Sequence, residues 1–294
     1  MTTDPSREYT RSWCPSGEID DVELADGTRL RYLQTGSGPS VLVLLHTVRT
    51  QLDHFQLVIP KLRDAFTVYA IDLPGMGWSD ITLGASYTEP ALRDAVIELV
   101  TTLDLTHVTL AGESMGATLS LTAATELRDR VRRVLAFNTY DYSKGVGRAN
   151  RVASAYVAGA NLPVLGAAVT SMENKPVLSI VLRGGLYDPT KLPDHYLTEL
   201  RHAGRRRGYP RVARAVFGNV ESMIAARALY QHISVPVTLI YGDHDWSHST
   251  EREANLELIP GARSISLPNT GHFAAIEQPT RFAEILLDSI HERS

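Results

Sequence analysis

Short, continuously apolar runs recur along this chain, and segments with helical periodicity lie between most of them. The run at 41–45, Val-Leu-Val-Leu-Leu, is typical of a strand that is covered on both faces. Further buried-strand patterns lie at 67–71, 107–111, 133–137, 235–241 and 263–267. Helical patterns lie at 89–103, 117–127 and 277–291. Strands that alternate with helices predict an α/β fold with a mostly parallel central sheet flanked by helices.

The strand rhythm is interrupted once, between residues 140 and 231, where the chain is expected to form helices and loops. We therefore predict a core domain made of 1–139 and 232–294, and an inserted helical domain at 140–231. Before the first buried strand, Asp26-Gly27 separates two short alternating segments and predicts an opening hairpin. The apolar window 152–169 is broken by Asn161 and Pro163, so it predicts a buried helical stretch and no membrane span.

Composition excludes several classes of protein. With 44% hydrophobic residues, 21% charged residues and a formal net charge of −4, the chain has no strong positive field to attract nucleic acid. The single cysteine, Cys14, cannot form an intrachain disulfide, and no Cys/His cluster has zinc-ligand spacing. The polar N-terminal segment lacks the apolar centre of a signal peptide. We expect a cytoplasmic protein without a metal, a cofactor or a membrane span.

One motif carries nucleophilic chemistry. Gly112-Glu113-Ser114-Met115-Gly116 follows a predicted strand and opens a predicted helix. That context identifies a nucleophile elbow, because the two glycines allow the backbone to turn sharply around a strained serine. Glu113 is expected to project away from the tip of the elbow.

A serine hydroxyl is a weak nucleophile at neutral pH and needs a base, which in turn needs an orienting acid. His272, between the last predicted strand and helix, is the candidate base. Asp245, on the loop after the strand at 235–241, is the candidate acid. Asp243 and Asp141 are its rivals; the first could instead cap the turn after the strand, and the second follows the preceding strand.

The sequence resembles the α/β-hydrolase family from Glu23 onward, specifically its serine-nucleophile branch, which includes esterases and C–C bond hydrolases. The resemblance rests on five motifs: 44–46, 72–79, the Ser114 elbow, 242–245 and 271–273. It implies an α/β-hydrolase fold in which the insertion roofs the active site as a cap. We expect a monomer or homodimer that acts on a small-molecule substrate.

The resemblance further implies an oxyanion hole formed by the backbone N–H of Met115 and that of Thr47 or Val48. Thr47 stands where the family usually has glycine. Plant hydroxynitrile lyases share a threonine there, but they carry a lysine after the catalytic histidine, where this chain has Phe273. We therefore interpret Thr47 as narrowing the pocket and adding a hydroxyl near the oxyanion. The residues expected to contact substrate are His46, Val48, Trp246 and Phe273.

The predicted reaction is cleavage of a carboxylic ester-like bond through an acyl-enzyme on Ser114. A C–C bond hydrolase, a thioesterase or a lactonase with the same triad is the alternative, followed by a hydroxynitrile-lyase-like enzyme or a non-catalytic binding protein. Haloalkane dehalogenases and epoxide hydrolases are disfavoured, since they require a carboxylate nucleophile.

Three further features of the sequence stay open. The segment 53–55 could line the pocket or begin a helix. Apolar residues of the insertion are candidates for a substrate-facing surface: Val164, Leu165, Val177, Leu178 and Ile180. A basic run could hold an anionic substrate tail or form a solvated surface: Arg201, Arg205, Arg206, Arg207, Arg211 and Arg214.

Overall fold

A computed structural model describes residues 5–163, 165–171 and 175–291. Its centre is an eight-stranded sheet with the order β1-β2-β4-β3-β5-β6-β7-β8. The strands are β1 (Glu18–Glu23), β2 (Arg29–Thr35), β3 (Ser40–Leu45), β4 (Phe66–Ile71), β5 (Val108–Glu113), β6 (Val131–Phe137), β7 (Val237–Gly242) and β8 (Arg263–Leu267). The β1–β2 and β2–β4 pairs are antiparallel, and all other pairs are parallel. The opening hairpin and the mostly parallel sheet are confirmed.

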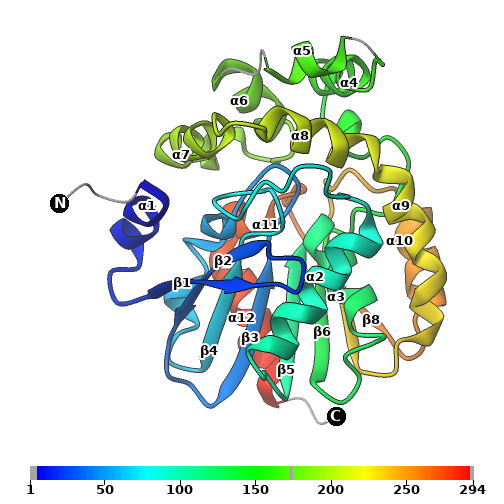
Figure 1. Cartoon of the computed structure of the whole chain (residues 1–294). Helices are drawn as coiled ribbons and strands as arrows, with labels where there is room; N and C mark the ends of the chain where they lie inside the picture. Colours follow the sequence, from blue (N-terminus) through cyan, green and yellow to red (C-terminus); the bar gives the residue numbers. More distant parts are fainter. Residues whose placement is uncertain (1–4, 164, 172–174, 292–294) are drawn as a thin grey trace.

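Helices cover both faces of this sheet, as the apolar runs predict. The helices of the core are α1 (Pro5–Trp13), η1 (Leu52–Phe55), η2 (Ile59–Lys61), α2 (Glu89–Thr102), α3 (Met115–Ala123), α10 (Ser249–Leu258), α11 (Ala274–Glu277) and α12 (Pro279–His291). In Figure 1, α2 and α3 lie in front of the sheet and α12 lies behind it. Because successive side chains of a strand point to opposite faces, Val43 joins the core under α2 and α3, whereas Leu44 joins the core under α12.

The chain between β6 and β7 forms helices and no strand within the described residues. They are η3 (Gly145–Arg148), α4 (Arg151–Ala160), α5 (Gly166–Ser171), α6 (Lys175–Arg183), η4 (Pro189–Lys191), α7 (Asp194–Gly204), α8 (Tyr209–Gly218), α9 (Val220–Ala225) and η5 (Ala226–His232). Figure 1 shows α4 to α8 as a layer above one end of the sheet. The insertion leaves from the end of β6, so this layer lies over the carboxyl ends of the parallel strands.

The window 152–169 differs from its prediction. It is divided between α4 and α5, and Val152, Leu162 and Leu165 are exposed. Helix α4 is amphipathic, with Ala153, Tyr156 and Ala160 among its buried residues, so apolar content alone overestimated its burial. No helix in the described part of the chain is long and apolar enough to cross a membrane.

Candidate active site

Strand β5 ends directly before Ser114, and helix α3 begins directly after it. Ser114 has φ 58° and ψ −117°, a conformation that is costly for a residue with a side chain. The glycines on either side of it are needed because the chain is crowded there. A Cβ on Gly112 would lie 2.3 Å from the carbonyl of Gly116, and a Cβ on Gly116 would lie 2.0 Å from the carbonyl oxygen of Leu45. The sequence motif therefore forms the sharp strand-turn-helix that was predicted.

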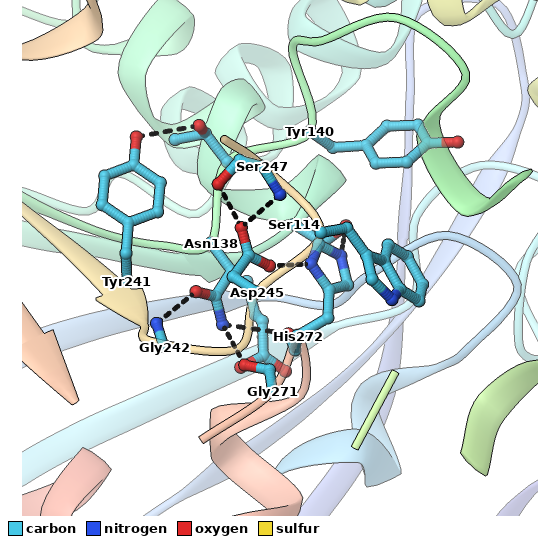
Figure 2. A network of polar contacts seen from close by, with 12 residues as sticks. Ser114, Asn138, Tyr140, Tyr241, Gly242, Asp245, Ser247, Gly271 and His272 are labelled. Atoms are coloured by element: carbon cyan, nitrogen blue, oxygen red, sulfur yellow. Dashed lines mark hydrogen bonds and ion pairs between the residues drawn. The ribbon is translucent and has the colours of Figure 1, made fainter. Parts of the chain in front are cut away.

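The structure brings Ser114, His272 and Asp245 together (Figure 2). The Oγ of Ser114 lies 2.7 Å from Nε2 of His272, and Nδ1 of His272 hydrogen-bonds Oδ1 of Asp245. The three side chains come from the turn after β5, the loop after β7 and the loop before α11. Ser114 and His272 are fully buried, so this relay is shielded from bulk water.

Asp245 is held in its charged form. Burial by itself would raise its pKa, but the His272 imidazole and hydrogen bonds from His272 and Ser247 outweigh burial and lower the pKa below its usual value. Ser247 donates to Oδ2 from both its backbone N–H, at 3.0 Å, and its hydroxyl. Oδ1 is thereby left for the imidazole.

Asp141, one rival acid, belongs to a different network. It accepts hydrogen bonds from Tyr230 at 2.7 Å, from Asn255 at 2.9 Å and from Thr139 at 3.0 Å. Burial raises the pKa of Asp141 despite these bonds. The other rival, Asp243, accepts from the backbone N–H groups of residues 269 and 270 and so has the turn-capping role considered for it.

Asn138, at the end of β6, is a site residue that the sequence analysis missed. Its amide nitrogen donates to the carbonyls of His272, at 3.0 Å, and Gly271, at 3.3 Å, while its amide oxygen accepts from the Gly242 N–H at 2.9 Å (Figure 2). It thus joins the acid-bearing loop to the base-bearing loop. Only its position at the carboxyl end of a predicted strand could have indicated this.

The loop after β3 lies against the elbow, since Gly116 packs on the carbonyls of Leu45 and His46. His46 is buried; its Nδ1 donates to the Thr47 carbonyl at 2.7 Å, and its Nε2 accepts from the Leu73 N–H at 3.0 Å. Burial lowers the pKa of His46 to about 4, so the ring is neutral. With both ring nitrogens bonded to backbone, His46 shapes this loop, and the structure does not support the predicted contact with substrate.

Thr47 is fully buried, and its hydroxyl oxygen has no hydrogen-bond partner among the described residues. Buried polar atoms are usually paired, so an unpaired one on the loop that packs against the elbow has chemical interest. The Thr47 carbonyl, by contrast, accepts from His46 and from the Thr50 hydroxyl at 2.8 Å, which holds the backbone of the loop in place.

A family model described as the alpha/beta hydrolase family matches residues 42–285. The chain belongs to this family. Among curated proteins, the uncharacterized hydrolase YugF of Bacillus subtilis (strain 168) is 26% identical over 272 residues, which cover 90% of this chain and 95% of YugF. Haloalkane dehalogenase 2 of Mycobacterium tuberculosis (strain ATCC 25618 / H37Rv) is 26% identical over 276 residues, which cover 88% of this chain and 91% of the dehalogenase.

The solved structure of wild-type Cfl2 from Burkholderia cenocepacia superposes with a TM-score of 0.80 at 22% identity, over 93% of this chain and 95% of Cfl2. At that identity the likeness concerns the fold. The family is a family of hydrolases, and its members act on different bonds, as the dehalogenase illustrates. The reaction of this hydrolase must therefore be argued from its own site.

Beside the relay of this hydrolase lies a cavity of only about 20 Å³. Three predicted substrate-binding residues line it: Val48, Trp246 and Phe273. The insertion supplies other apolar walls: Val146, Tyr156, Leu178, Val181, Leu182 and Phe217. Among the apolar candidates of the insertion, Leu178 lines this cavity, and Val177 does not. Leu165 and Ile180 are exposed. Val164 lies outside the described residues.

Trp246 packs directly on the candidate base. Its ring lies parallel to the imidazole of His272, with centroids 3.8 Å apart and planes 14° apart. The indole N–H donates to the carbonyl of Gly184, at 3.2 Å, and the backbone N–H of His272 donates to the carbonyl of Gly185, at 2.6 Å. The segment after α6 therefore bonds the backbone of the base directly and bonds the indole that packs on its ring.

Glu113 points away from the tip of the elbow, as predicted. It is buried, accepts the Ala275 N–H at 3.1 Å and pairs with Nε2 of His54. His54 belongs to η1, so the open question about segment 53–55 is answered by a short helix behind the elbow. Asp53, in the same turn, pairs with Arg31 at 3.2 Å. Neither side chain lines the cavity beside the relay.

Among the residues that the structure describes, no group of three or more His, Cys, Asp and Glu side chains has the arrangement of a metal site.

Proposed function

We propose that this protein is a serine hydrolase that cleaves a carboxylic ester-like bond of a small, partly apolar substrate through an acyl-enzyme on Ser114. The observation that carries the proposal is the hydrogen-bonded series from Ser114 through His272 to Asp245. A hydroxyl, an imidazole and a carboxylate in this order are the groups that general-base activation of a serine requires.

In the proposed reaction, Nε2 of His272 removes the proton of the Ser114 hydroxyl while Oγ attacks the carbonyl carbon of the substrate. The imidazolium that forms is stabilised by Asp245, whose low pKa keeps it ionised. His272 then protonates the leaving alkoxide as the tetrahedral intermediate collapses to the acyl-enzyme. Water, activated by the same imidazole, attacks the acyl-enzyme and releases the acid.

The negative oxygen of the intermediate needs donors that are already in position. The backbone N–H of Met115, at the first turn of α3, and that of Thr47 or Val48 are the proposed donors. The buried and unpaired hydroxyl of Thr47 is a further proposed donor. Each such donor is worth roughly 2.7–4 kcal/mol of transition-state stabilisation in a water-excluded site.

Two other reactions of similar proteins are less well supported. A haloalkane dehalogenase needs a carboxylate nucleophile, and the residue at the elbow is Ser114. A hydroxynitrile lyase like those of plants needs a cation beside the histidine, and Phe273 occupies that place.

The apolar cavity lining supports a partly apolar acyl group. Since a cavity of about 20 Å³ holds only one or two waters, binding such a group requires the walls of the cavity to move apart.

The direct test is covalent labelling with a fluorophosphonate probe followed by peptide mapping. Stoichiometric modification of Ser114, and none in Ser114→Ala, is the expected result. A turnover screen across esters, thioesters, lactones and ring-fission dienones, with Ser114→Ala as the blank, then identifies the leaving group. If folded protein is inert to the probe, the chain is a ligand-binding member of the family and the proposal is wrong.

A further inference from the structure

Four arginines of the basic run line a cavity in the insertion. Its volume is about 510 Å³, and five of its lining residues are arginines: Arg49, Arg201, Arg205, Arg206 and Arg207. Four of them come from the end of α7 and the loop that leads to α8, which lie together above the sheet (Figure 1). Arg49 comes from the loop after β3, next to the proposed oxyanion donors. The cavity therefore lies between the insertion and the loop that carries the proposed oxyanion donors.

The four insertion arginines form no ion pair with an acidic side chain of the described residues. Across the described residues, no carboxylate lies within 4.0 Å of the guanidinium groups of Arg201, Arg205, Arg206 or Arg207, whereas Arg148 pairs with Glu251 at 2.7 Å. Arg206 donates to two backbone carbonyls. Its Nε is buried and has no hydrogen-bond partner among the described residues. In a protein of net charge −4, this is a local excess of positive charge.

The basic cavity adjoins the apolar cavity beside the relay, because Arg49 and Leu178 line both. Arg49 has φ 62°, a conformation that is uncommon for a residue with a side chain. Its guanidinium carbon lies 4.5 Å from the ring centroid of Tyr209, the first residue of α8. The loop after β3 thus reaches the insertion at the boundary between the two cavities.

We propose that the basic cavity binds an anionic group, a carboxylate or a phosphate, at the far end of a substrate whose scissile carbonyl lies at Ser114. This rests on the proposed serine hydrolase function and defines its substrate class. Once widened, the apolar cavity accepts the chain between the two ends. Guanidinium groups supply the paired N–H donors that match carboxylate and phosphate oxygens. An anionic tail supplies the counter-charge that the four insertion arginines lack among the described residues.

The test compares two esters of equal chain length, 4-nitrophenyl hexanoate and the mono-4-nitrophenyl ester of adipic acid. We expect wild-type kcat/KM to favour the adipate ester about tenfold or more. The double variant Arg201→Gln/Arg205→Gln should lose most of this preference through KM, with activity on the hexanoate ester retained. The control Arg132→Gln/Arg211→Gln removes the same net charge from residues that do not line the cavity, and it should keep the preference.

Equal kcat/KM for the two esters, or equal loss of the preference in both double variants, would overturn the inference. Labelling of Ser114 by the fluorophosphonate probe is measured in parallel and reports on the proposed function alone. If no ester is turned over, calorimetry of wild type with adipate and with inorganic phosphate still decides the matter. Binding that is weakened about tenfold in Arg201→Gln/Arg205→Gln supports the site and shows which anion it prefers, and absence of binding at millimolar anion refutes it.

Discussion

Single residues carry the proposed chemistry, and the strongest prediction concerns two of them. Ser114→Ala and His272→Ala should each lower kcat by at least about 10³-fold, because a nucleophile and its base act as one unit. Asp245→Asn should be less damaging than Ser114→Ala. Steady-state kinetics on the best ester from the screen, with circular dichroism as the folding check, measures this. Retention of more than about a tenth of the activity in either alanine variant would falsify the proposed mechanism.

A second residue-scale prediction concerns the Thr47 hydroxyl. Thr47→Val removes a buried, unpaired hydroxyl and keeps the backbone of the loop. If the hydroxyl donates to the oxyanion, kcat should fall about 10²-fold. The melting temperature should stay the same or rise, since no hydrogen bond within the described protein is lost. Thr47→Ser keeps the donor and is the matched control. Unchanged kcat in Thr47→Val would leave the backbone donors as the whole oxyanion hole.

At the scale of elements, the segment that follows α6 contacts residues 271–277, which comprise the loop before α11 and that helix. Besides the bond from His272 to the Gly185 carbonyl, Glu277 accepts the Asp188 N–H at 2.7 Å and the Gly271 N–H at 2.6 Å. We therefore expect the position of the insertion and the orientation of the base to depend on each other. A displaced insertion should therefore change catalysis, as well as access to the site.

Gly185→Ala tests this dependence. A Cβ there would lie 2.5 Å from the ring of Phe273 and 2.8 Å from the ring of Trp246, so one of these groups must move. We expect kcat to fall about tenfold or more while the fold is retained, because small misplacements of catalytic groups have large effects on rate. Gly147→Ala, whose Cβ would have its nearest neighbour at 3.7 Å, is the control within the insertion. Equal kcat in both variants would contradict the coupling.

At the scale of the whole molecule, burial of a neutral histidine makes stability depend on pH. The pKa of His46 is about 4 in the folded protein, against 6.5 for an ordinary histidine. Between these values the unfolded chain binds more protons, so lowering the pH favours unfolding. From pH 7.5 to pH 5 this site should lower the free energy of unfolding by about 2 kcal/mol.

Urea unfolding at the two pH values measures this, with His46→Gln as the comparison. The variant lacks the titrating group, so its pH dependence should be smaller than that of wild type by about the same 2 kcal/mol. An NMR titration of the imidazole is independent of how well the variant folds. A His46 ring that protonates near pH 6.5 in the folded protein would show the prediction to be wrong.

Much of the fold followed from local patterns. The run at 41–45 became β3 because its alternate side chains pack on opposite cores, so an unbroken apolar run is what a central strand requires. For the window 152–169 the predicted burial was too high. Helix α4 has one exposed and one buried face, and the apolar content of a window does not distinguish the two. Residues that join loops, such as Asn138, carry no local signal beyond their position at the end of a strand, since their partners lie more than a hundred positions away.

By itself, the sequence determined the α/β architecture, the strained turn at Ser114 and the candidate base, because each depends on neighbours within a few residues. Only the tertiary structure decided between Asp245, Asp243 and Asp141, since the choice depends on which carboxylate reaches the imidazole of His272 in space. It also bonded both ring nitrogens of His46 to backbone groups, and it placed four arginines of the basic run, together with Arg49, around one cavity: Arg201, Arg205, Arg206 and Arg207. Chain folding brings such distant side chains together, and linear spacing does not encode their distances.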